Sequence, residues 1–99
     1  MPQVAISQVR LDANGRLRLR SSGPSAYPSI YRSASSVRWD AATGELYVLE
    51  ISGFDAIAEF KQIAAAVMQE YGDHLVISSE TKYVGISVEM ASALGEAAV

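Results

Sequence analysis

Gly53-Phe-Asp-Ala-Ile-Ala-Glu-Phe-Lys-Gln-Ile-Ala-Ala-Ala-Val-Met-Gln-Glu-Tyr-Gly72 is the one segment of this 99-residue chain with clear helical periodicity. Its apolar side chains recur at steps of three and four, which places them on one stripe of a helix. The stripe consists of Ile57, Phe60, Ile63, Ala64, Val67, Met68 and Tyr71. Glu59, Glu70 and the other polar side chains are expected on the helix surface.

The ends of this helix are also marked in the sequence. Ser52 is a good N-cap, and Asp55 three residues later resembles a capping box. Gly72 suits the left-handed conformation that commonly ends a helix. We therefore expect one principal helix over about residues 53–71.

Strand patterns precede the helix. Residues 3–12 and 16–20 alternate apolar and polar side chains on either side of Asn14-Gly15. This dipeptide predicts a hairpin with a type I′ turn, because both residues tolerate positive φ. A change of phase around Gln8 indicates a β-bulge in the first strand.

Four more strands are predicted around the helix. Residues 37–40 alternate, and residues 45–51 are apolar on both faces, which suggests an inner position in the sheet. Residues 74–78 and 83–88 form the last two strands, with a turn between them. The Ala-rich residues 90–99 can add one or two helical turns.

These elements predict a single α+β domain over residues 1–99. A curved, mainly antiparallel sheet of five or six strands, in the order β-β-β-β-α-β-β, packs on the one principal helix. One helix covers only one face of such a sheet. The second face must meet the long loop, a curled part of the sheet or another subunit, so we expect a homodimer.

The composition limits both compartment and chemistry. The chain has no cysteine, which excludes disulfides and thiolate chemistry, and it lacks a signal peptide or a membrane-spanning stretch. A cytoplasmic protein with no membrane contact is the expectation. The net charge is −3, but residues 1–40 carry a balance of +4 and residues 41–99 one of −7. Such asymmetry suits a charged partner or self-association.

Catalytic, metal and cofactor signatures are not found. His74 is the single histidine; Asp73 is adjacent, but no serine sits in a nucleophile-elbow pattern, and a lone histidine without cysteine argues against a zinc site. Glycine spacing gives no phosphate-binding or dinucleotide loop. We therefore predict no catalytic residue, no metal and no cofactor, and the chain is interpreted as a non-enzyme rather than an enzyme.

Four arginines form a candidate basic face. Arg16, Arg18 and Arg20 alternate along one strand, and Arg10 extends the row across the hairpin. The row can contact an anionic partner, or it can simply protect a solvated strand from edge pairing. A pI near 5.0 and the lack of an aromatic-basic RNA motif argue against nucleic acid.

The loop between the second and third strands supplies aromatic candidates. Tyr27, Tyr31 and Arg32 lie in this loop, and Trp39 follows it. Tyr, Trp and Arg are enriched at binding hot spots. The alternative is that these rings cap the end of the core.

Two functions remain open. The first is a small non-enzymatic interaction module of the bacterial cytoplasm, self-associating and binding another macromolecule such as a protein, as an accessory or immunity-type protein does. The second is a small-ligand-binding domain or small enzyme with an aromatic-lined pocket at the open end of the sheet. Its candidate lining is Tyr27, Tyr31, Trp39, Tyr47, His74 and Tyr83.

Overall fold

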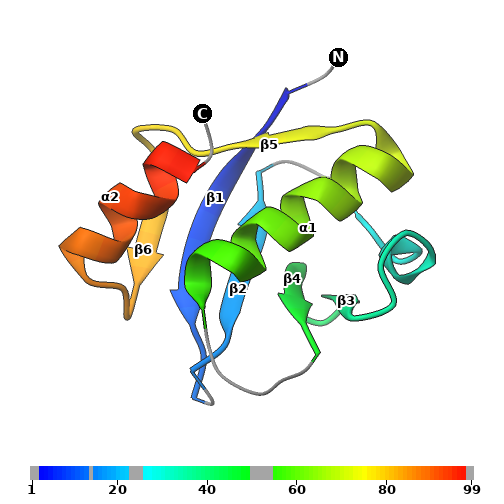
Figure 1. Cartoon of the computed structure of the whole chain (residues 1–99), viewed down its shortest axis with the longest axis horizontal. Helices are drawn as coiled ribbons and strands as arrows, with labels where there is room; N and C mark the ends of the chain where they lie inside the picture. Colours follow the sequence, from blue (N-terminus) through cyan, green and yellow to red (C-terminus); the bar gives the residue numbers. More distant parts are fainter. Residues whose placement is uncertain (1–2, 14, 23–25, 50–54, 98–99) are drawn as a thin grey trace.

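A computed structural model describes residues 3–13, 15–22, 26–49 and 55–97. Two layers stack along its shortest dimension, with the helices in front of the sheet (Figure 1). The elements are β1 (Gln3–Leu11), β2 (Leu17–Ser21), the 3₁₀ helix η1 (Ile30–Arg32), β3 (Val37–Asp40), β4 (Glu45–Val48), α1 (Ala56–Tyr71), β5 (His74–Val76), β6 (Lys82–Val84) and α2 (Val88–Ala97).

The sheet has the strand order β3-β4-β2-β1-β5, and β6 also pairs with β1. The β1–β2, β2–β4 and β3–β4 pairs are antiparallel. This arrangement confirms the α+β class and the mainly antiparallel sheet. The inner position expected for β4 is confirmed too, because β4 lies between β3 and β2.

The strands β5 and β6 differ from expectation, because both pair in parallel with β1 instead of joining the sheet as antiparallel strands. β5 and β6 follow one another along the same edge of β1, as two parts of one interrupted strand. Buried Thr81 lies at the interruption, where its hydroxyl donates to the Ile6 carbonyl at 2.6 Å and accepts from the Ser78 amide at 3.0 Å. The carbonyl beside the break thereby keeps a partner.

The β1–β2 hairpin contains the expected bulge, since its register shifts between Ile6 and Gln8. Its turn is not the expected type I′ turn. The Gly15 amide donates to the Asp12 carbonyl at 2.9 Å, one residue too early for a turn centred on residues 14 and 15. Gly15 itself has φ +77°, as in hairpin loops that end in a glycine bulge. Asn14 lies outside the described residues.

Helix α1 begins later than the capping pattern predicted. Its N-cap is Asp55, whose Oδ1 accepts from the amides of Ile57 at 3.1 Å and Ala58 at 3.2 Å. The choice of Ser52 as N-cap was therefore wrong, and residues 50–54 lie outside the described part of the chain. The C-terminal cap is confirmed, because Gly72 has φ +74° and donates to the Met68 carbonyl.

The predicted stripe of α1 supplies much of the core. Phe60, Ile63 and Val67 are at most 1% exposed. Glu59 corrects the sequence prediction, because it is buried at 6% exposure instead of lying on the surface. Its carboxylate accepts from Arg16 at 3.1 Å and from the Leu17 amide at 3.4 Å, which ties the first turn of α1 to the start of β2.

The C-terminal segment forms a full second helix. The strand expected over residues 83–88 ends at Val84, and Val88 begins α2 with 82% of its surface exposed. Leu94 is fully buried and anchors α2 in the core, beside α1. Two helices therefore cover the sheet where one was expected.

Alternation along the strands separates the two faces of the sheet. The face toward the helices is apolar and buried, and it includes Val9, Leu17, Leu19, Val37, Leu46 and Val48. Their neighbours point to the opposite face, since successive side chains of a strand alternate. We call this second side, which neither described α-helix covers, the open face.

Candidate functional site

The open face carries a row of charged side chains from β1, β2, β4 and β3. Cross-strand pairing aligns Arg10 with Arg18 and Arg18 with Tyr47, and it aligns Arg20 with Glu45. Residues paired across a sheet point to the same side. Arg38 and Asp40 of β3 extend the row, opposite Tyr47 and Glu45.

Glu45 is the centre of this arrangement and is 1% exposed. Arg10 holds it with two contacts, from Nε to Oε2 at 2.7 Å and from Nη2 to Oε1 at 2.8 Å. Arg18 donates from Nη1 to Oε1 at 3.0 Å. A bidentate guanidinium and a second arginine thus replace the water that this carboxylate loses on burial.

The arginines keep Glu45 charged. Burial raises the pKa of this carboxyl, but the hydrogen bonds and charges of Arg10 and Arg18 outweigh burial, and the pKa lies below its ordinary value of 4.5. Glu45 in turn raises the pKa of Arg10. Glu45 and Arg10 therefore both carry their charge in the physiological pH range.

Arg18 joins the remaining members of the cluster. Its Nη1 donates to Asp40 Oδ2 at 3.2 Å, and its Nε lies 3.5 Å from Asp12 Oδ2. The guanidinium carbon stands 4.5 Å from the centre of the Tyr47 ring, in cation–π geometry. We call Arg10, Arg18, Glu45, Asp40, Asp12 and Tyr47 the Glu45 cluster.

The predicted basic face is therefore only partly formed. Arg10, Arg18 and Arg20 share the open face, and Arg20 is exposed while it donates to the Thr43 carbonyl at 3.1 Å. Arg16 does not share it, because it precedes β2 and pairs with Glu59 of α1. Carboxylates neutralise most of the positive charge, so the surface is mixed in sign.

Tyr27, the first aromatic candidate, is a core residue. It is 1% exposed, its ring meets that of Tyr71 edge-on at 4.9 Å, and its hydroxyl donates to Asp73 at 3.3 Å. Tyr31 and Arg32 lie in η1 and point outward, with Tyr31 53% exposed and Arg32 3.8 Å from Glu70. The loop thus closes the core at the C-terminal end of α1.

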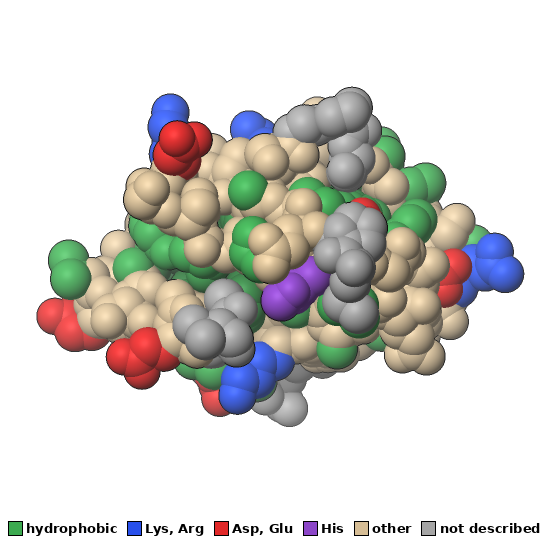
Figure 2. All heavy atoms as spheres, turned by 90° about the horizontal axis from the view of Figure 1, so that it is seen from above, with side chains coloured by type: hydrophobic (Ala, Val, Ile, Leu, Met, Phe, Trp, Pro, Cys, Tyr) green, Lys and Arg blue, Asp and Glu red, His purple; other side chains and the backbone are tan. Residues whose placement is uncertain are grey.

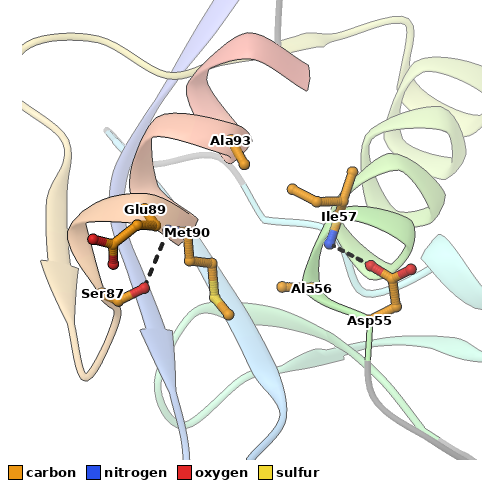
Figure 3. A pocket seen from close by; sticks show the side chains of 7 residues that line it. All are labelled: Asp55, Ala56, Ile57, Ser87, Glu89, Met90 and Ala93. Atoms are coloured by element: carbon orange, nitrogen blue, oxygen red, sulfur yellow. Dashed lines mark hydrogen bonds between the residues drawn. The ribbon is translucent and has the colours of Figure 1, made fainter.

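The other aromatic candidates do not converge with Tyr27. Trp39 and Tyr83 pack against the core, whereas Tyr47 lies on the open face. His74 lies at the edge formed by β5 and is visible in the middle of Figure 2. These candidate side chains are thus divided among the core, η1, the open face and the β5 edge of the described chain. A groove does occur near the N-termini of α1 and α2 (Figure 3), and none of these six residues lines it.

A family model described as Integron Cassette Protein Hfx_Cass5 matches residues 3–81 of this chain. The chain belongs to this family of integron cassette proteins. A similar solved structure is described as "Structure from the mobile metagenome of North West Arm Sewage Outfall: Integron Cassette Protein Hfx_Cass5". It is 31% identical, with 99% of this chain and 97% of that chain covered and a TM-score of 0.48. No curated protein matches this chain.

The part that matches the family contains the whole Glu45 cluster, whereas β6 and α2 lie beyond it. Within the described residues, no three acidic or histidine side chains come together as a metal site. No described helix has the length and apolar character to span a bilayer. The open face is thus the candidate site that this integron cassette protein offers.

The Glu45 cluster had only a weak signal in the sequence. Glu45 and Arg18 are far apart in the chain. The alternation of side chains along each strand shows which face of the sheet a residue occupies, but not which residue of another strand it meets. The antiparallel register of β2 and β4 brings them together. Sequence reasoning therefore found Arg10, Arg18 and Tyr47 separately and missed Glu45, Asp40 and Asp12.

Proposed function

We propose that this integron cassette protein is a small non-catalytic interaction module whose open face binds another protein chain. The supporting observation is the Glu45 cluster, which fixes Arg10, Arg18 and Tyr47 in place before any partner arrives. Arginine and tyrosine supply much of the binding energy at protein interfaces. Side chains that are already immobilised lose little further entropy on binding.

The first partner we propose is a second copy of the chain. The open face lies across the two long dimensions of the molecule, 31 and 30 Å. A face of this size can supply the roughly 800 Å² per partner of a standard interface. The mixed charge also fits a two-fold contact, in which each surface must complement itself.

The same surface is proposed to bind a further macromolecule, as in an accessory or immunity-type protein. Exposed Arg20 and the edge residues Lys82 and Val84 border the Glu45 cluster on this face. A cytoplasmic site of action is part of the proposal, and it rests on the cysteine-free composition.

Self-association is tested with charge changes that leave the Glu45 cluster intact. Lys82→Glu combined with Val84→Glu places two acids on the open face, at side chains that are already exposed. Lys61→Glu makes a similar charge change on the exposed side of α1 and is the matched control. Sedimentation velocity is run on all three proteins over a range of micromolar concentrations.

The wild type and the Lys61→Glu control are expected to sediment at twice the 10.6 kDa chain mass. The open-face variant is expected to sediment as a monomer with an unchanged circular dichroism spectrum. A wild type that stays at 10.6 kDa throughout refutes the self-association. An open-face variant that still sediments as a dimer would show that the interface lies elsewhere on the molecule.

A further inference from the structure

Strand β3 forms one edge of the described sheet, next to β4 (Figure 1). Along an edge strand of an antiparallel pair, residues that bond to the neighbouring strand alternate with residues whose backbone groups point away from it. The Leu49 amide donates to the Ser36 carbonyl at 2.6 Å, just before β3 begins, and this bond fixes the alternation. Val37 and Trp39 therefore turn their backbone N–H and C=O groups to the outer side of the sheet.

The outer backbone groups of Val37 are occupied, whereas those of Trp39 are not. The Val37 amide donates to the Ala34 carbonyl at 3.0 Å, and the Val37 carbonyl accepts from Nη1 of Arg38 at 3.3 Å. Within the described residues, the backbone amide and carbonyl of Trp39 have no hydrogen-bonding partner in the chain. An unpaired edge of this kind is where an extended peptide adds to a sheet as a further strand.

The side chains on either side of Trp39 determine which charges such a strand must carry. Arg38 and Asp40 both lie on the open face, because their cross-strand partners in β4 do. Arg38 donates to the backbone carbonyls of Ser35 and Val37 and pairs with no carboxylate among the described residues. A carboxylate placed opposite Arg38 by an added strand would supply that ion pair.

The hydrogen-bonding pattern also fixes the register of an added antiparallel strand. The residue that faces Trp39 exchanges both backbone hydrogen bonds with it. Since the two strands run in opposite directions, the preceding residue of the added strand lies opposite Asp40 and the following residue lies opposite Arg38. The charges therefore match an added strand with a base, then a residue that faces Trp39, then an acid.

The segment Arg38-Trp39-Asp40 has this order itself, so β3 of a second copy is the competing occupant. The four residues of β3 extend over only about 13 Å. Pairing of two such edges offers far less than the roughly 800 Å² per partner of a standard interface. A segment of a different protein is not limited in this way, because it can continue past β3 and contact the open face as well.

We propose that the outer edge of β3 binds an extended segment of a partner protein as an added antiparallel strand. The segment carries a basic residue opposite Asp40 and an acidic residue opposite Arg38. This proposal rests on the protein-binding role given above and names the chemistry of that partner. It does not depend on contact between copies, which is tested with side chains of β6 at the other edge of the sheet.

The test titrates a synthetic peptide with the central sequence Val-Lys-Val-Glu-Val into the full chain. Two-dimensional amide NMR and amide hydrogen exchange follow the Trp39 backbone amide. We expect a saturable shift of this signal and slower exchange, while the Val37 amide, which is already bonded, keeps its exchange rate. No saturable change at the Trp39 amide overturns the site, and sedimentation of the chain alone still decides self-association.

Two peptide controls separate strand addition from general attraction. Methylation of the backbone nitrogen of the middle valine removes the donor to the Trp39 carbonyl and should abolish binding; equal binding of this peptide overturns strand addition. The second control replaces the glutamate by glutamine. Protection of the Trp39 amide that rises with protein concentration, without peptide, would assign the edge to a second copy and overturn the proposal.

A protein variant tests the charge assignment. One exposed ion pair is worth about a two- to five-fold change in affinity, so Arg38→Gln should bind the glutamate peptide that much more weakly. The same variant should bind the glutamine peptide as the wild type does, which shows that the two side chains meet. Lys61→Gln removes an exposed positive charge from α1 and is the matched control. Equal affinity of Arg38→Gln and Lys61→Gln for the glutamate peptide overturns the pairing.

Discussion

Glu45→Gln is the most direct test of how the open face is built. Glutamine keeps the shape of the side chain but removes its charge, and its amide group turns a donor toward the arginines. Removing one partner of a buried ion pair costs about 3–5 kcal/mol. Arg10 and Arg18 keep 28% and 14% exposure, and Arg18 retains Asp40 and Asp12. We therefore expect the free energy of unfolding to fall by about 2–3 kcal/mol at neutral pH.

The loss should depend on pH in a defined direction. The pKa of Glu45 is lowered on folding, so its contribution is complete above the ordinary value of 4.5. It disappears as the pH falls through the folded-state pKa, because protonated Glu45 resembles glutamine. The stabilities of wild type and variant should therefore converge as the pH falls below 4.5 and through this lowered pKa. Asp40, whose pKa is also lowered, is present in both proteins and cancels in this comparison.

Urea unfolding followed through the single tryptophan, Trp39, measures both effects. Glu70→Gln is the control, because Glu70 accepts from Ser33 at 2.8 Å but lies 3.8 Å from an exposed Arg32. That variant should lose less than about 1 kcal/mol. A loss below about 1 kcal/mol for Glu45→Gln, or a gap that persists in acid, would refute the view of Glu45 as a desolvated, charged centre.

Two further changes test the helices. Phe60→Ala should cost about 3–5 kcal/mol in chemical unfolding, because its ring is 1% exposed and leaves a cavity; a cost under about 1 kcal/mol would place it outside the core. Gly72→Ala should cost about 1–2 kcal/mol, since φ is +74° and no atom lies within 4 Å of the added Cβ, so the loss is purely conformational. Gly95→Ala in α2 is the matched control and should be neutral or slightly stabilising, and equal losses at the two glycines would contradict this account.

Local patterns identified most of the secondary structure. The stripe of Phe60, Ile63 and Val67 predicted α1, and Gly72 predicted its end, because both signals depend on neighbours within two helical turns. The Gln8 bulge likewise followed from a local change of phase. The positions of the helix N-cap and of the hairpin turn were predicted less accurately. The capping pattern assigned the N-cap to Ser52 and gave Asp55 a place in the first helical turn, whereas Asp55 is itself the N-cap.

The sequence by itself determined the α+β class, the principal helix, the hairpin and the apolar face of each strand, because spacing along the chain sets which side chains share a side. The tertiary structure decided which distant residues meet. It placed Glu45 against Arg10 and Arg18, buried Glu59 against Arg16, and set β5 and β6 in parallel beside β1. The register of the strands and the order in which they join the sheet determine these pairings, and neither produces a periodic pattern in the sequence.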